Sequence, residues 1–464
     1  MANNKYWGTW SFYKRALTIA LPIMAQLLIQ NFVSLIDNFM VAGLGDIKMG
    51  GVNVANQISF IFVIIINTIC ASGGIFMSQF KGAKDKEGMQ QTFRFKIFLT
   101  GIFGIIFGTI CLIAPRWLYS LMVTVNSDAQ SIIDQSVAYS RAVAISWVFA
   151  VFSQSIASSL REIELVKPPL VISIIATLIN TFFNWVFIYG NLGAPRLEVA
   201  GAGYATVIAR AAELIMFLCY IKRKKPDFIF SPKKMFNIDF SLSRTIIAKS
   251  GMILYSELTW AVSETISNAL YNTRGGAEVV SGMASGFAVA NLFFICLSGI
   301  CTATAVILGQ ELGAGKLEEG RQMKNWILNG STVFGTFFAI LGIGTTAIVP
   351  FVFKNLTPQA QSIAKGLIIT AAVYLPLWAY LNAQYSISRT GGDTTMGVIC
   401  DTVGNALFLL GMILLTFLTS FGPILMYAIV KLSDIPKSVI AAIWLKKERW
   451  LKNLTIKQGD SKSQ

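Results

Sequence analysis

The sequence matches itself at an offset of 231 residues. Residues 20–91 align with residues 251–322 without a gap. The densest agreement joins residues 79–87 to residues 310–318, where Gln, Gly, Ala and Glu recur in the same order. Duplication inside a hydrophobic chain is typical of membrane transporters built from two similar lobes around one pathway. The repeat therefore predicts that the two halves of the chain have the same backbone arrangement.

The composition places this repeat in a membrane. Apolar residues make up 54% of the 464 residues and charged residues only 13%, about half the charge of a soluble protein. About twelve apolar runs are long enough to cross roughly 30 Å of hydrocarbon. They cover residues 15–40, 52–79, 92–113, 137–160, 168–189, 199–221, 246–271, 280–310, 325–349, 365–388, 394–417 and 422–445. Lipid leaves backbone groups no outside partner, so these runs should be helices.

The predicted fold is therefore an all-α polytopic membrane protein with twelve transmembrane helices in two six-helix lobes around a central cleft. Six helices per repeat is an even number, so both repeats cross the membrane in the same direction and are parallel repeats. The predicted organisation is an N-terminal lobe (1–221), a cytoplasmic linker (222–249), a C-terminal lobe (250–450) and a cytoplasmic tail (451–464).

The net charge of +15 follows from membrane orientation. With the N-terminus inside, most lysines and arginines fall in cytoplasmic segments, as the positive-inside rule requires. These segments contain Lys14, Arg15, Lys81, Lys84, Lys86, Arg94, Lys96, residues 222–225, Lys316, Arg321 and Lys446. We therefore expect a multi-pass plasma (inner) membrane protein with both termini cytoplasmic, lipid as a partner and no nucleic acid.

Two segments outside the apolar runs have distinct compositions. The linker, residues 222–249, interleaves lysines with aromatic residues, and we expect it to lie on the anionic inner leaflet. The tail after Trp450 is polar, and we expect it to be frayed.

The residue inventory excludes most membrane enzymes. The chain has no histidine, and its six cysteines show no CxxC spacing. Without histidine the commonest general base and metal ligand is missing. We expect no enzymatic activity, no cofactor, and no metal other than Na⁺ at the acidic site described next.

Asp37 is an acidic residue within the first apolar run, and its counterpart in the second repeat is Asn268. A carboxylate in hydrocarbon is costly and favours a functional role. It can exchange a proton or bind Na⁺ through hard oxygen ligands. Asn180 and Asn184 are four residues apart on one helix face, and Thr206 adds a hydroxyl. These four residues are the candidate cation-coupling site; the alternative is hydrogen bonding that holds helices together.

Glu257 is the second acidic candidate, near the middle of the seventh apolar run with Trp260 close by. A carboxylate beside aromatic rings suits an organic cation, because ring faces add cation–π attraction. It suits a proton site equally. Glu264 is two helical turns further along the same face. Glu257, Trp260 and Glu264 are the candidate substrate-binding residues.

Other charged residues in apolar runs are spaced for structural pairing. Arg210 and Glu213 are three residues apart and should neutralise each other. Lys431, Asp434 and Lys437 are also spaced by three and predict a charge ladder along one helix.

Motifs along the whole chain resemble the multidrug and toxic compound extrusion (MATE) family. Their order and spacing carry the resemblance: ALPIMAQLLIQ, SLIDNFMVAGLG, VANQISFIF, ASGGIFMSQFKGAKD, LINTFFNWVFIYG, VAGAGYATVIAR, GQELGAGKLEEGRQ, SRTGGDTT and ERWLKNLT. The resemblance implies twelve helices in two lobes around a central cleft. It also implies antiport, in which Na⁺ or H⁺ moves inward as an amphipathic, usually cationic, compound leaves.

The resemblance also implies residue roles. The family's helix-one carboxylate corresponds to Asp37, its helix-five pair to Asn180 and Asn184, and its helix-six threonine to Thr206. The chain departs from the family where many members have aspartate and it has Asn184, which leaves one carboxylate at the site. Glu257 resembles a helix-seven glutamate of one bacterial branch.

The predicted function is a secondary active antiporter that exports amphipathic, cationic drugs or metabolites in exchange for H⁺ or Na⁺, acting as a monomer. The alternative is a flippase for lipid-linked oligosaccharide or lipid with the same two-lobe plan. That alternative predicts a cationic cleft for phosphate-bearing head groups, whereas the apolar runs offer mainly acidic and amide groups.

Overall fold

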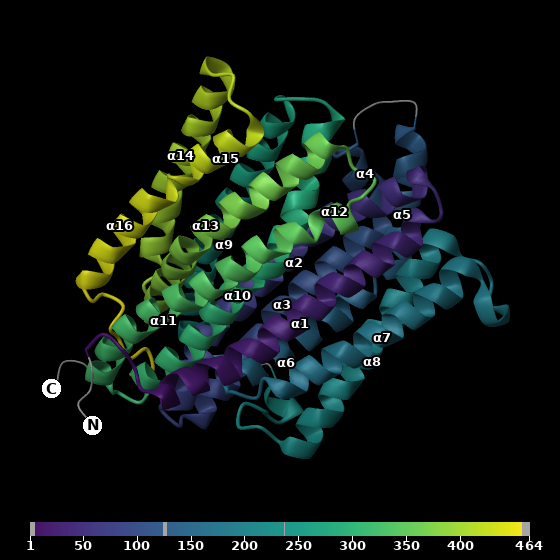
Figure 1. Ribbon diagram of the computed structural model, residues 1–464. Helices are drawn as coiled ribbons and strands as arrows, with labels where there is room; N and C mark the ends of the chain where they lie inside the picture. The colour runs from purple at the N-terminus through teal and green to yellow at the C-terminus, as the bar shows by residue number, and fades with distance from the viewer. Residues whose placement is uncertain (1–4, 124–127, 236, 457–464) are drawn as a thin grey trace. The chain divides into compact units, whose positions relative to one another are not determined.

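The computed structural model describes residues 5–123, 128–235 and 237–456. These residues form α-helices and short 3-10 turns, with no β-strand among them (Figure 1), which confirms the all-α fold. The helices are α1 (Trp10–Ala42), α2 (Asp46–Gly82), α3 (Lys86–Ile113), α4 (Pro115–Ser120), α5 (Ala129–Val143), α6 (Ser146–Glu162), α7 (Lys167–Tyr189), α8 (Glu198–Lys224), α9 (Phe240–Asn272), α10 (Ala277–Gly313), α11 (Leu317–Gly344), α12 (Val349–Val352), α13 (Pro358–Thr390), α14 (Thr395–Leu418), α15 (Pro423–Lys431) and α16 (Asp434–Lys446).

Nine helices in the described part of the chain are long and apolar enough to cross a membrane. The bent pair of α5 and α6, with 57° between its halves, adds a tenth. Two predicted segments are not in this set. Residues 246–271 form most of α9, which carries two glutamates, and residues 422–445 are divided between α15 and α16. The count of twelve spans therefore stays a prediction.

The chain divides into two compact units. One contains Ala25–Met77 and Asp85–Ile247, and the other contains Met1–Met24, Ser78–Lys84 and Ala248–Gln464. The start of α1 and the end of α2 thus pack with the C-terminal residues, although both helices belong to the first sequence repeat. The domain boundary predicted at residues 222–249 stays a prediction.

The two repeats meet at equivalent positions where α2 and α10 end. A Cβ atom on Gly82 would overlap the carbonyl oxygen of Gln310, and one on Gly313 would overlap that of Gln79. Gly82 corresponds to Gly313, and Gln79 to Gln310, under the sequence offset. The contact is therefore reciprocal, and it depends on glycine because the two backbones approach closely.

The linker packs on α3, and its position relative to the inner leaflet stays a prediction. Phe228 is fully buried, and its ring meets Phe93 edge to face at 4.7 Å. The Arg94 guanidinium donates to the Asn237 carbonyl at 3.0 Å and lies over the Phe230 ring at 5.2 Å. The apolar residues of the linker are thus used for packing against protein.

The start of the tail is held in place, so the expectation of fraying is wrong for residues 451–456; the rest of the tail lies outside the described residues. Trp450 is fully buried. The Gln79 side chain donates to the Thr390 carbonyl at 2.8 Å and accepts from the Leu454 amide at 2.7 Å. Asn453 donates to a carbonyl at the end of α10 at 3.1 Å. The tail therefore covers the helix ends at which the repeats meet.

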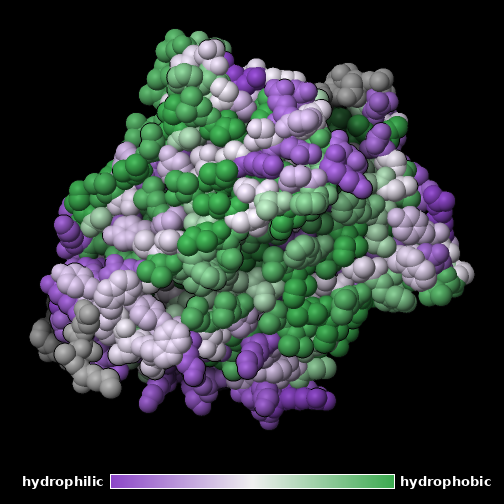
Figure 2. Space-filling model, in the orientation of Figure 1, coloured by the Kyte–Doolittle hydropathy of each residue, from purple (hydrophilic) through white to green (hydrophobic). Residues whose placement is uncertain are grey.

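Hydrophobic side chains lie along the helices on the face in Figure 2, and hydrophilic ones gather near helix ends. Phe39, Phe351 and Phe417 are more than three-quarters exposed. Large apolar side chains exposed in this number suit lipid rather than water.

Candidate functional site

The structure brings together the four residues predicted to form the cation-coupling site. The Asn184 amide donates to the Asp37 carboxylate at 2.8 Å and to the Asn180 oxygen at 3.3 Å. The Asn180 amide in turn donates to the Thr206 hydroxyl at 3.4 Å. One hydrogen-bonded chain therefore connects α1, α7 and α8.

Close packing of α7 against α8 positions these side chains. Gly190 ends α7 in a left-handed conformation (φ 76°) and lets the chain turn back. Leu197 then donates to the Phe187 carbonyl at 2.8 Å, and a Cβ on Gly201 would lie only 2.6 Å from that oxygen. The two helices leave this turn side by side (Figure 1), which brings Thr206 opposite Asn180.

The charge of Asp37 has no basic partner in the described part of the chain. Its only hydrogen bond there comes from the Asn184 amide, whose own oxygen is buried without a partner. Five other carboxylates within the helices each have a cation: Glu162 has Lys96 (3.0 Å), Glu213 has Arg210 (2.7 Å), Glu257 has Arg389 (3.3 Å), Glu264 has Lys431 (2.5 Å) and Asp434 has Lys437 (3.6 Å). Asp37 and its neighbours thus offer oxygen ligands to a cation from outside.

Tyr139 on α5 also belongs to this cluster. Its phenol lies near the Thr206 hydroxyl and the Asp37 and Arg210 side chains. The sequence analysis missed Tyr139, because a tyrosine in an apolar run is ordinarily a packing residue.

Glu257 is paired with a residue that the sequence analysis did not identify. Its carboxylate accepts from the Arg389 guanidinium at 3.3 Å, and the side chains are 40% and 26% exposed respectively. Arg389 also lies over the Tyr385 ring at 5.6 Å. Trp260 is half exposed. A cation that binds Glu257 must therefore compete with Arg389, and the substrate-binding role stays a prediction.

Glu264 lies in more enclosed surroundings. It pairs with Lys431 at 2.5 Å, and both side chains are mostly buried. Three aromatic rings surround the lysine ammonium, with Phe408 at 4.6 Å, Tyr427 at 5.5 Å and Trp378 at 5.8 Å. An internal cation already occupies this aromatic setting, which favours a structural role for Glu264; its predicted role in substrate binding is untested.

The predicted charge ladder is wrong for Lys431. The helix breaks after this residue, so Lys431 ends α15 while Asp434 and Lys437 begin α16. Lys437 donates to Asn405 at 2.9 Å and lies 3.9 Å from Asp401. The break sends the two lysines to different helices, which periodicity alone could not show.

A buried ion pair joins α3 to α6 through Lys96 and Glu162. The sequence analysis had assigned Lys96 only to a cytoplasmic segment. Lys96 is fully buried and bonds to Glu162 and Ser159 at 3.0 Å each. A Cβ on Gly73 would lie 2.7 Å from the Lys96 side chain, and one on Gly74 would overlap the Glu162 carboxylate. The adjacent glycines of the ASGG motif, Gly73 and Gly74, were the available sequence signal, because they leave room on α2 for the Lys96 and Glu162 side chains.

Comparison with known proteins gives the family. The MatE family model matches residues 22–186 and 253–429, which start 231 residues apart, as the internal repeat does. The chain belongs to the MatE family. The resemblance to MATE transporters noted in the sequence is confirmed, and the chain is a multi-pass membrane transporter.

Individual relatives are distant in sequence and close in fold. A Haemophilus ducreyi protein named "Probable multidrug resistance protein NorM" is 25% identical over 363 residues, 77% of this chain and 76% of the relative. A structure of a variant of the Vibrio cholerae MATE transporter VcmN has a TM-score of 0.82 at 16% identity, covering 95% of this chain and 98% of that one. A MOP superfamily transporter from Pyrococcus furiosus has a TM-score of 0.79 at 16% identity, covering 94% and 95%.

Proposed function

We propose that this transporter exports amphipathic, cationic compounds in exchange for H⁺ or Na⁺ that enters at Asp37. The observation that carries the proposal is the pairing of charges. Asp37 accepts a hydrogen bond from a neutral amide, whereas the other helix carboxylates named above each have a basic side chain. A carboxylate left without an internal cation is the one available to a transported cation.

Neutralisation of Asp37 supplies the coupling. A charged carboxylate among apolar helices is costly, and a bound proton or Na⁺ removes most of that cost. The two forms of the site therefore favour different arrangements of α1, the helix that carries Asp37. A cation that binds one arrangement better shifts the equilibrium between them.

The proposed substrate contacts are Glu257 and Trp260. Both are partly exposed, so an incoming cation can reach the carboxylate and the ring face. The Glu257–Arg389 pair, at 3.3 Å and 26–40% exposed, is open enough to exchange partners, because solvated ion pairs are worth little. The name of the Haemophilus relative, a probable multidrug resistance protein, supports drugs as the substrate class.

The pairing of basic residues with carboxylates favours export of cations over the lipid flippase. In the Pyrococcus transporter, the reverse polarity of the binding pocket suggests a different function, so the two-lobe fold is compatible with other cargo. An anionic head group needs basic side chains that are not neutralised. In this chain Arg389, Lys431 and Lys437 all lie against carboxylates.

Purified protein in liposomes tests the proposal. Efflux of a fluorescent cation should follow an imposed pH or Na⁺ gradient, and comparing the two gradients identifies the coupling ion. Asp37→Asn should reduce gradient-driven efflux to background, because the amide cannot be charged. Asp46→Asn, at an exposed position at the start of α2, is the matched control and should transport like the wild type. Undiminished efflux by the Asp37 variant would move coupling elsewhere, and gradient-independent flipping of a labelled lipid would support the flippase.

A further inference from the structure

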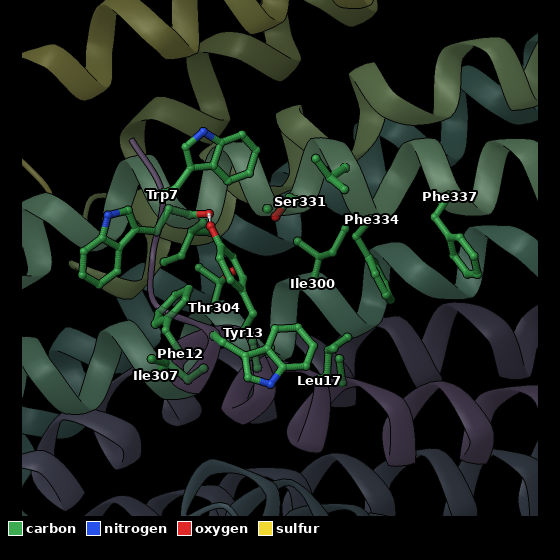
Figure 3. Close-up of a pocket in the computed structure, with 18 residues that line it drawn as sticks. Trp7, Phe12, Tyr13, Leu17, Ile300, Thr304, Ile307, Ser331, Phe334 and Phe337 are labelled. Atoms are coloured by element: carbon green, nitrogen blue, oxygen red, sulfur yellow. Dashed lines mark hydrogen bonds between the residues drawn. The ribbon is translucent and has the colours of Figure 1, made fainter. Parts of the chain in front are cut away.

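An apolar groove lies at the start of α1, and neither Asp37 nor Glu257 is among its lining residues. Its volume is about 450 Å³, within the range of small-molecule sites. The segment before α1, the first turns of α1, and α10 and α11 form its walls (Figure 3), all within one compact unit. The lining includes Trp7, Trp10, Leu17, Thr304, Ser331 and Phe337.

The groove is as long as one leaflet of a bilayer. On α1 its lining runs from Trp10 to Ala20, and on α11 from Trp326 to Phe337. At about 1.5 Å per residue these stretches cover roughly 15–17 Å, and half of a hydrocarbon core is also about 15 Å. In Figure 3 Trp7 and Tyr13 lie towards one end and Phe337 at the other.

The tryptophan end of the groove has the features of a membrane–water interface. Trp10 is 73% exposed and Trp7 about half exposed, and exposed tryptophans gather where hydrocarbon meets head groups. Asn325 and Asn329 hold the preceding segment by donating to the Lys5 and Tyr6 carbonyls at 3.2 and 2.8 Å. The groove thus begins at the interface and follows the helices into the hydrocarbon.

Its side faces outward along α11. Val333 and Phe337 both line the groove and are each 56% exposed. Hydrocarbon surrounds side chains at this depth in a membrane, and an empty channel of this size would forfeit dispersion contacts along its whole length. A groove of this shape suits a flexible apolar chain that can enter from the side.

The charge around the groove selects among amphipathic occupants. The lining contains no carboxylate. Exposed Lys5 and Lys14 occur just before and just after the tryptophans in the sequence, at the interface end. We propose that the groove binds one acyl chain of a phospholipid with an anionic head group, in the leaflet nearest the N-terminus, with the head group beside Lys5 and Lys14. A cationic transport substrate is the wrong charge for this end.

Lipid retained by the purified protein tests the site. Mass spectrometry of wild-type protein washed in detergent should detect bound phosphatidylglycerol in preference to phosphatidylcholine. Ser331→Leu and Thr304→Leu fill the groove and should reduce retained lipid at least tenfold. Thr336→Leu, at an exposed position on α11 outside the lining, should retain as much as the wild type. Trp10→Ala removes an exposed wall without affecting the core and should reduce retention about fivefold.

A variant that removes the two lysines and a competing lipophilic cation distinguish an anionic lipid from other ligands of the groove. Lys5→Gln with Lys14→Gln should abolish the preference for the anionic lipid while a phospholipid is still retained. Tetraphenylphosphonium, a lipophilic cation, should not displace the lipid. The proposal is overturned if the filled grooves retain wild-type amounts of lipid, or if the cation displaces lipid and loses affinity in parallel in Ser331→Leu. These readouts do not depend on transport, so failure of the proposed efflux function leaves them unchanged.

Discussion

At the level of single residues, the role of each carboxylate depends on the side chain that it is paired with. Glu162 lies against fully buried Lys96, and removing one member of such a pair leaves a buried charge uncompensated, at a cost of about 3–5 kcal/mol. Such pairs serve the fold and are too costly to open in each transport cycle. Asp37, held by an amide, has no cation to displace among the described residues, and this difference separates the coupling candidate from the structural acids.

Glu257 and Arg389 should affect substrate binding in opposite directions. Glu257→Gln keeps the shape of the side chain and removes its charge, so binding of a permanent cation should weaken by about 1–3 kcal/mol, roughly five- to 150-fold. Binding of a neutral amphiphile should change little. Arg389→Gln removes the competing partner at 3.3 Å and should strengthen cation binding. Equilibrium binding of a matched cationic and neutral ligand measures both effects.

Equal losses for both ligands in Glu257→Gln would assign Glu257 to the fold or to proton coupling. Thr259→Val, one turn from Tyr255 and with its hydroxyl bonded to carbonyls of its own helix, is the control and should bind both ligands like the wild type.

The ends of α2 and α10, which are equivalent in the two repeats, pack against each other at Gly82 and Gly313. Gly313→Ala places a Cβ against the Gln79 carbonyl, and neither backbone can move without disturbing its helix. The variant should lose about 1–3 kcal/mol of stability, which thermal unfolding in detergent measures as a lower midpoint. Gly411→Ala on α14, where a Cβ meets nothing within 4 Å, should instead be neutral or more stable by up to about 1 kcal/mol. A wild-type midpoint for Gly313→Ala would mean that the contact between α2 and α10 is loose.

Membrane orientation is a property of the whole molecule and remains a prediction from the positive-inside pattern. A single cysteine at Ser231, exposed in the linker, should react only with reagents that reach the cytoplasm, in a background without native cysteines. A cysteine at Asn355, exposed between α12 and α13, should react from outside intact cells. Labelling of the Ser231 site from outside would reverse the assigned orientation.

The candidate residues of the acidic site could be identified because their individual signals are local. Asn180 and Asn184 share a helix face through their spacing alone, and a lone aspartate in an apolar run needs a reason to be there. The partners of the other acids could not be predicted. Glu257 and Arg389 are 132 positions apart, and no periodicity connects residues on different helices. Lys431 was assigned to the wrong partners because the helix breaks at Leu432 and Ser433, where the spacing by three residues no longer places side chains on one face.

The sequence alone is sufficient to predict most of the helices, the membrane location and the internal repeat. Hydrocarbon forces backbone hydrogen bonds within each segment, so apolar length is sufficient to predict a helix. The folded structure was needed to show which charges are neutralised, where the linker and the start of the tail pack, and that a groove lies beside α1. These features depend on side chains brought together from distant parts of the chain. Such contacts form, and contribute to stability, only when the helices have packed.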